Sequence, residues 1–301
     1  MDRLNFTIPD FTRIAWTGLD VRRHWEPRIT EICHAWSRIE ILSVNQGIRQ
    51  AALIGVSKDN IDDAKREWAK LGLNHKILAS VGSSRYPYAN ATTSSENADD
   101  VAAYRVVLGK GSITSEACDA FTNRDSSRIG ELLGYPECCT KFFEDTWVQQ
   151  GFLDTTWSMA IRSKTATRSG NQVIVPLSPM SNILWRWAGI RPVFHLPCQF
   201  GCRQTEAVAK PIFDLLSDAG FKVQSDWLRD CLSFPVEWSA LHGIAEIKNP
   251  LFKISSRTDA TGQKYSVAYE GDRYPSINHN GIRFPFNRMV RGNGKETNNA
   301  A

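Results

Sequence analysis

The chain has 301 residues, of which 42% are hydrophobic and 23% are charged, a balance typical of soluble globular proteins with ample core. Its formal charge of +4 is mildly basic, and no dense block of Lys and Arg is present, so the composition permits an anionic substrate but does not require nucleic acid. No apolar run has the length of a signal peptide or a membrane span, which argues against a membrane protein.

These features predict a cytoplasmic protein. The cytosol is reducing, so the seven cysteines are not expected to form a disulfide framework. Clustered cysteines in such a protein are more often used for metal binding or catalysis.

The first part of the chain predicts a small α/β domain over residues 1–110. Trp25, Ile29, Ile32 and Trp36 recur at spacings of three and four, which is typical of an amphipathic helix. Strands and helices alternate after it. The expected elements are a helix at 20–39, a strand at 48–56, a helix at 58–71, and strands at 75–81 and 103–109, with a polar loop at 82–100.

The remainder predicts an α+β fold with a mostly helical centre and a C-terminal β meander. The centre, 111–235, carries two cysteine-bearing helix N-termini and is followed by a β meander at 236–290 and a disordered tail at 291–301. The helices expected in the centre cover 114–122, 126–133, 136–148, 153–162, 180–188, 203–219 and 225–232.

Two short stretches, 134–139 (GYPECC) and 195–202 (HLPCQFGC), are the main functional signal. Each places a proline ahead of cysteine at the start of a helical pattern, where proline is favoured because its missing N–H is not needed. Backbone N–H groups and the helix dipole at such a position lower the pKa of a thiol. The thiolate that results is the form that binds metal or attacks a substrate.

Four cysteines and one histidine of these stretches are the candidate metal ligands. Cys198 and Cys202 are four residues apart and can reach one centre, with His195 as a further ligand or a proton carrier. Cys138 and Cys139 are adjacent, so both can take part only if their diverging side chains reach a cluster or two metals. Soft thiolates favour an iron–sulfur cluster or another thiophilic metal, with zinc or no cofactor as alternatives. The spacing matches no standard zinc or ferredoxin motif.

Two further groups of residues are candidates for chemistry. His242 and Glu246 are four apart near a predicted strand, where a histidine beside a carboxylate can act as a general base; structural polar pairing is the alternative. Arg186 and Arg191 precede the second cysteine stretch and can hold a carboxylate or phosphate, or can be solvated surface charges.

The motifs resemble an uncharacterised family of prokaryotic proteins with G-Y-P-x-C-C and H-x-P-C-x3-C patterns. The resemblance covers about residues 100–290. It is carried by LGYPECC at 133–139, WRWAGIRP at 185–192 leading into HLPC at 195–198, and WSALHG at 238–243. It implies that both cysteine stretches belong to one site and implies no particular activity.

The function expected from the sequence is a metal- or iron–sulfur-dependent enzyme acting on a small, potentially anionic metabolite by sulfur transfer or redox chemistry. One alternative is a metal-free thiol oxidoreductase or sulfur-transfer enzyme that uses the vicinal cysteine pair. Another is a zinc-stapled protein that binds an anionic partner. Neither nucleic acid nor membrane is the expected partner, and the pattern predicts no oligomeric state.

Overall fold

The computed structural model describes residues 12–82, 101–152, 154–176, 178–259 and 262–273. The predicted loop at 82–100 lies outside the described residues except for its first position. The predicted tail at 291–301 and the part of the meander segment beyond 273 also lie outside them.

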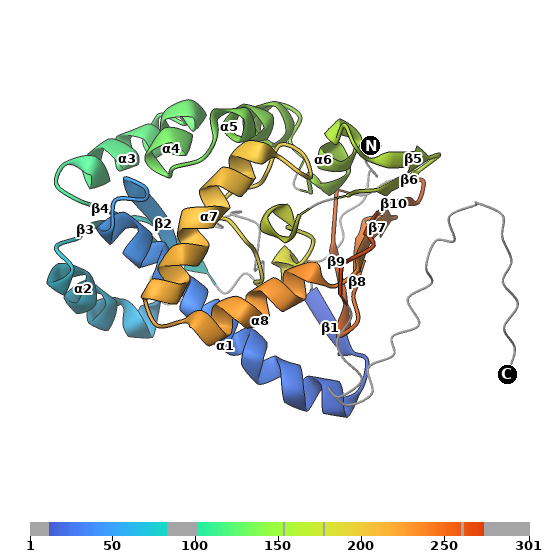
Figure 1. Ribbon diagram of the computed structural model, residues 1–301. Helices are drawn as coiled ribbons and strands as arrows, with labels where there is room; N and C mark the ends of the chain where they lie inside the picture. The colour runs from blue at the N-terminus through green and yellow to red at the C-terminus, as the bar shows by residue number, and fades with distance from the viewer. Residues whose placement is uncertain (1–11, 83–100, 153, 177, 260–261, 274–301) are drawn as a thin grey trace, which may run out of the picture.

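A seven-stranded sheet forms one end of the molecule (Figure 1). Its neighbouring strands are antiparallel except for one parallel pair, β10 with β6. In sheet order the strands are β1 (Thr12–Trp16), β9 (Phe252–Arg257), β8 (Ile244–Lys248), β7 (Val236–Leu241), β10 (Tyr265–Tyr269), β6 (Gln172–Ile174) and β5 (Thr167–Ser169). The C-terminal β meander is therefore β7 to β9, with β10 added beside β7.

A smaller antiparallel sheet lies at the other end, in the order β2 (Ala51–Ser57), β4 (Val101–Gly109) and β3 (Asn74–Gly82). Side chains of β4 alternate between its two faces, as the pleat requires. Val106 and Leu108 pack with α2 (Ile61–Lys70). Val107 packs on the opposite side, in a core shared with α3 (Ile113–Thr122) and α4 (Ser126–Leu132).

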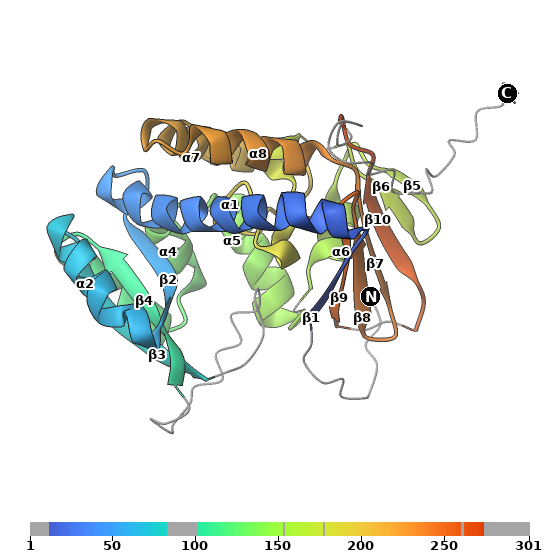
Figure 2. The same ribbon diagram turned by 90° about the horizontal axis from the view of Figure 1, so that it is seen from below.

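Helix α1 (Leu19–Asn45) runs between the two sheets (Figure 2). Trp25 and Trp36 lie in the large core beside the seven-stranded sheet, whereas Val44 belongs to the core of the small sheet. The other helices are α5 (Glu137–Phe143), α6 (Thr156–Arg162), α7 (Arg203–Asp218) and α8 (Lys222–Ser233). Among the described residues, no helix combines the length and apolarity needed to cross a bilayer.

The structure confirms the α+β class and the helical centre, and two local expectations need correction. The expected helix at 180–188 is wrong. Two short 3-10 turns, Pro179–Ser181 and Arg186–Ala188, stand there, and the left-handed Gly189 (φ +77°) ends the second. Strand β1 was not expected. It pairs with β9, so the N-terminal segment contributes to the C-terminal sheet, and the domain limits at 110 and 235 stay a prediction.

Candidate metal centre

The first cysteine stretch is a turn between two helices. Gly134 adopts φ +72° and ends α4, with the Tyr135 N–H donating to the Gly130 carbonyl at 2.8 Å. This left-handed ending suits glycine, which has no Cβ to clash. Pro136 then caps α5 in an extended conformation, and Cys138 and Cys139 fall in the first turn of that helix.

The second stretch is an irregular loop that ends at α7. Two hydrogen bonds hold this loop in place. The Phe200 N–H donates to Ser163 Oγ at 2.9 Å, and the Gly201 N–H donates to Ser181 Oγ at 3.2 Å. Gly201 adopts φ +76°, and Cys202 becomes the N-cap residue of α7. The loop therefore has a fixed path, with Cys198 on its outer part and Cys202 at the helix start.

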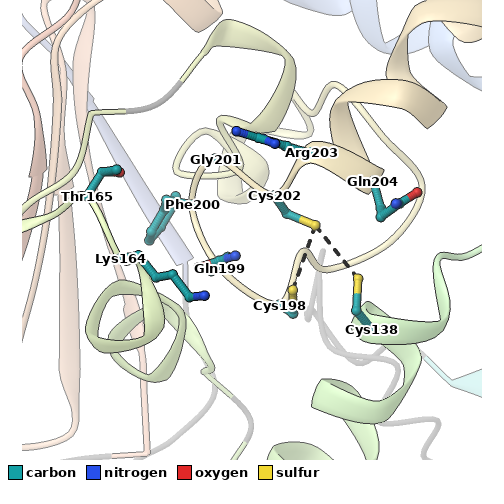
Figure 3. A pocket seen from close by; sticks show the side chains of 10 residues that line it. All are labelled: Cys138, Lys164, Thr165, Cys198, Gln199, Phe200, Gly201, Cys202, Arg203 and Gln204. Carbon is teal, nitrogen blue, oxygen red and sulfur yellow. Dashed lines mark hydrogen bonds between the residues drawn. The ribbon is translucent and has the colours of Figure 1, made fainter.

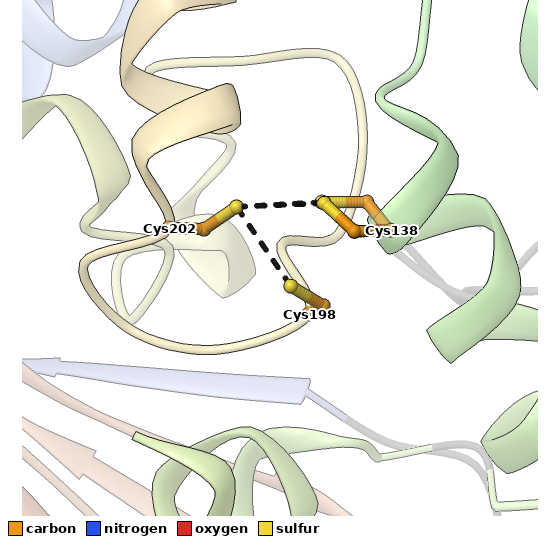
Figure 4. A group of neighbouring side chains, drawn as sticks. Cys138, Cys198 and Cys202 are labelled. Carbon is orange, nitrogen blue, oxygen red and sulfur yellow. Dashed lines mark hydrogen bonds between the residues drawn. The ribbon is translucent and has the colours of Figure 1, made fainter. Parts of the chain in front are cut away.

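The four cysteine sulfurs converge on one point. Figure 4 labels three of these residues, Cys138, Cys198 and Cys202. All four Sγ atoms lie within 4.8 Å of one another. The Sγ of Cys202 lies 3.8 Å from that of Cys138, 3.9 Å from that of Cys139 and 3.7 Å from that of Cys198. The sulfurs of the adjacent pair, Cys138 and Cys139, are 3.8 Å apart. The expectation that both stretches meet in space is confirmed.

These distances fit four thiolates around a single ion. A zinc–sulfur bond of about 2.3 Å in tetrahedral geometry places two sulfurs about 3.8 Å apart. Four of the six separations lie between 3.7 and 3.9 Å. An iron–sulfur cluster needs larger separations, because iron and sulfide atoms stand between cysteines that bind different irons. The adjacent cysteines thus both reach a site the size of one ion.

The centre has a buried side and an open side. Cys139 and Cys202 are buried, Cys198 is partly buried and Cys138 is exposed. A cavity of about 520 Å³ touches Cys138, Cys198 and Cys202, and its wall also includes Lys164 and Arg203 (Figure 3). A small molecule in this cavity would lie directly against the sulfurs.

Hydrogen bonding between the thiols distributes their charge unevenly. The pKa of Cys202 is well below its usual value because Cys139, Cys198 and Thr205 donate to its sulfur. The bond with Cys139 lowers the pKa of Cys198, but its bond to Cys202 and its burial raise it further, to about 12. The pKa of Cys139 is raised by its bonds to Cys198 and Cys202. This hydrogen bonding therefore favours Cys202 as the thiolate of the group, and binding of a cation would require loss of the remaining thiol protons.

His195 lies behind the sulfurs and contacts them through Thr205. Its Nε2 is 3.0 Å from Thr205 Oγ1, which is 3.5 Å from the Sγ of Cys139. Burial lowers the pKa of His195 to about 4, so the ring is neutral near pH 7. Thr205 therefore lies between His195 and the sulfur of Cys139. Its direct metal-ligand role stays a prediction.

Arg186 takes part in a buried network elsewhere in the large core. Its guanidinium pairs with Asp154 at 3.0 Å and donates to Thr156 Oγ1 at 2.6 Å. The same carboxylate accepts from Trp238 Nε1 and Thr258 Oγ1, each at 3.0 Å. These contacts occupy the guanidinium within the protein, and the anion-binding role expected for Arg186 stays a prediction.

The other predicted residues also lie away from the cavity wall. Arg191 pairs with Glu40 of α1 at 2.5 Å. His242 is exposed in the turn between β7 and β8, with φ +48°. Glu246 on β8 pairs with Lys253 and Lys248, and these pairs lower its pKa although burial raises it. The structure does not pair His242 with Glu246, and their catalytic role stays a prediction.

Lys164, Arg203 and Thr205 were not found by sequence reasoning. Arg203 and Thr205 directly follow Cys202, so proximity in sequence was an available signal. Lys164 lies in the turn between α6 and β5, and only the hydrogen bond from Phe200 to the neighbouring Ser163 brings it to the cysteines.

Comparison of the chain with protein-family models, curated proteins and solved structures found no match.

Proposed function

We propose that the four cysteines bind one thiophilic metal ion, zinc or iron, at the edge of an enzyme's substrate cavity. The sulfur separations of 3.7 to 3.9 Å are the observation that carries this proposal. The protein is then a metal-dependent enzyme of the cytoplasm, where the reducing conditions keep the thiols available.

The open side of the centre favours catalysis over a purely structural ion. Structural zinc sites are closed by four protein ligands, whereas catalytic ions keep one position for water or substrate. Cys138 is the exposed ligand and lines the cavity. We expect it to give way to a substrate atom while Cys139, Cys198 and Cys202 stay in place. The bound ion would supply Lewis-acid or thiolate chemistry.

The first experiment measures metal and acid-labile sulfide in protein purified without oxygen. We expect one zinc or iron per chain and no sulfide. Cys139→Ser and Cys202→Ser should lose the metal, because serine is a poor ligand for a soft ion. Cys33→Ser, which alters a half-buried cysteine outside the cluster, is the matched control and should retain it. A metal-free wild type with intact thiols would contradict the proposal.

A second measurement separates a catalytic from a structural ion. If Cys138 is the exchangeable ligand, Cys138→Ser should retain most of the metal and bind it about 10-fold more weakly, whereas Cys139→Ser should not bind it. X-ray absorption of Cys138→Ser should then show three sulfur ligands and one lighter atom. Equal and complete loss from Cys138→Ser, Cys139→Ser and Cys202→Ser would indicate a closed site, as in a zinc-stapled binding protein.

A metal-free thiol enzyme is the second candidate, and the proximity of Cys138 to Cys202 favours it. Their sulfurs are 3.8 Å apart, and Cys202 carries a lowered pKa that suits a nucleophilic thiolate. This enzyme would purify without metal and would lose two thiols reversibly on mild oxidation. An iron–sulfur cluster, the cofactor expected from the sequence, would instead appear as iron with matching sulfide.

A further inference from the structure

The cavity beside the cysteines has an uneven charge. Its wall includes two cationic side chains, Lys164 and Arg203, and no Asp or Glu. Within the described part of the chain, neither Lys164 nor Arg203 forms an ion pair or a side-chain hydrogen bond. Arg186 and Arg191, by contrast, are paired with Asp154 and Glu40. Two uncompensated cations therefore face one cavity.

The backbone at Lys164 is held close to the cysteine loop. Ser163, its neighbour, is buried and accepts the Phe200 N–H at 2.9 Å, which couples the turn after α6 to the cysteine loop. Figure 3 shows the Lys164 side chain extending toward Gln199 and Cys198. The ammonium group thus stands at the entrance to the metal centre.

Arg203 adds a second donor from a different element. It is the first residue of α7, a helix of 16 residues whose N-terminus begins at Cys202. Free N–H groups and the positive end of the helix dipole strengthen anion binding at such a position. The amide side chains of Gln199 and Gln204 also line the cavity and can donate hydrogen bonds to oxyanions.

We propose that this cavity binds a small metabolite with a phosphate or carboxylate group, held by Lys164 and Arg203, beside the sulfurs of Cys138 and Cys198. This inference rests on the proposed function, since it identifies the substrate class of the same site. The volume of about 520 Å³ suits a small metabolite. The proposal assigns anion binding to Lys164 and Arg203 at the cavity wall, whereas the sequence predicts this role for Arg186 and Arg191.

Isothermal titration of the full-length, metal-loaded protein with inorganic pyrophosphate and with citrate tests the inference. We expect one of the two probes to bind; the one that does distinguishes a phosphate from a carboxylate ligand. Lys164→Gln and Arg203→Gln should each weaken binding about 10-fold, as expected for the loss of a charged hydrogen bond. Lys210→Gln removes the same charge from an exposed position on α7 outside the cavity and should change the Kd less than about twofold.

The metal content of each sample keeps the two proposals separate. Lys164→Gln and Arg203→Gln should keep the wild-type metal stoichiometry, because neither residue is a thiol ligand. Binding of neither probe to metal-loaded wild type would overturn the inference and leave the metal site standing. Equal weakening by Lys164→Gln and Lys210→Gln would also overturn it, since the effect would then be one of overall charge. Absence of metal from the wild type would instead contradict the proposed function.

Discussion

Thr205 joins the buried histidine to the metal centre, and this link leads to a prediction for a single hydroxyl. Its Oγ1 lies 3.0 Å from His195 Nε2 and 3.5 Å from the Sγ of Cys139. Groups that orient metal ligands commonly change metal affinity 10- to 100-fold when they are lost. Thr205→Val should therefore weaken zinc binding about 10-fold in a chelator competition assay, and Thr205→Ser should keep wild-type affinity. Equal affinity of both variants would contradict a supporting role for the hydroxyl.

His195 also makes stability depend on pH. Its pKa is about 4 in the folded chain, below the value of about 6.5 expected after unfolding. The unfolded state therefore binds more protons between these values, and the free energy of unfolding should decrease by about 3 kcal/mol as pH falls from 6.5 to 4. Urea unfolding at several pH values measures this change. His195→Gln should remove that part of the slope, and an unchanged slope would show that other groups cause it.

At the scale of elements, the Asp154 network connects the segment before α6 to strand β7. Its carboxylate accepts hydrogen bonds from Arg186 and Trp238, all of them buried. Removing one partner of a buried pair leaves an uncompensated charge and costs about 3–5 kcal/mol. Arg186→Gln should lower the free energy of unfolding by this amount.

The matched variant is Arg191→Gln, whose ion pair with Glu40 is partly exposed and should contribute about 1 kcal/mol or less. Urea denaturation of both variants gives the comparison. If Arg186→Gln kept wild-type stability and lost anion binding, the role expected from the sequence would be supported in place of the structural one.

The β7–β8 hairpin explains the backbone at His242 without catalysis. His242 and Gly243 both have positive φ, +48° and +78°, and form the two-residue turn between the paired Leu241 and Ile244. Asparagine favours this conformation, so His242→Asn should change stability by less than about 0.5 kcal/mol and leave metal content unchanged. Gly243→Ala should cost about 1–2 kcal/mol by thermal unfolding. Activity lost in a fully stable His242→Asn protein would support the catalytic prediction.

Elements with strong local signals were predictable, and those that depend on distant partners were not. Helix α1 and strand β4 show clear hydrophobic periodicity. In the first cysteine stretch, Gly134 and Pro136 mark the end of one helix and the start of the next. Strand β1 is short and mostly exposed, and its partner β9 lies about 240 residues away. The segment 180–188 is apolar enough for a buried helix, but Gly189 and the tight 3-10 turns bend it.

For the site, too, the features with a local sequence signal were predictable and those that depend on tertiary contacts were not. The four thiols could be grouped from their two similar turns, and the structure brings them together. That adjacent cysteines both reach one point depends on the approach of α5 to α7, which no local pattern specifies. Lys164 depends on a hydrogen bond between loops about 37 residues apart, so sequence reasoning selected the nearer arginines instead.

For the whole molecule, we expect α1 to make the two sheets unfold together. It belongs to both hydrophobic cores, and the cysteines add a second connection between α5 and α7, across 64 residues from Cys138 to Cys202. A metal ion that binds the folded site in preference to the unfolded chain stabilises the fold by mass action. Removing the metal should lower the Tm by several degrees while calorimetry still shows one transition. Two separated transitions would show that α1 does not couple the sheets.

The unequal burial of the four sulfurs also sets the order in which a metal ion would enter and leave. Cys139 and Cys202 are shielded by protein, whereas Cys138 meets solvent. A chelator or a metal-delivering protein would therefore approach from the open side, where Cys138 is the most exposed ligand, and exchange would begin by breaking that bond. The exchange rate of the ion would then depend on what occupies the cavity, so that a bound metabolite would slow the loss of the metal.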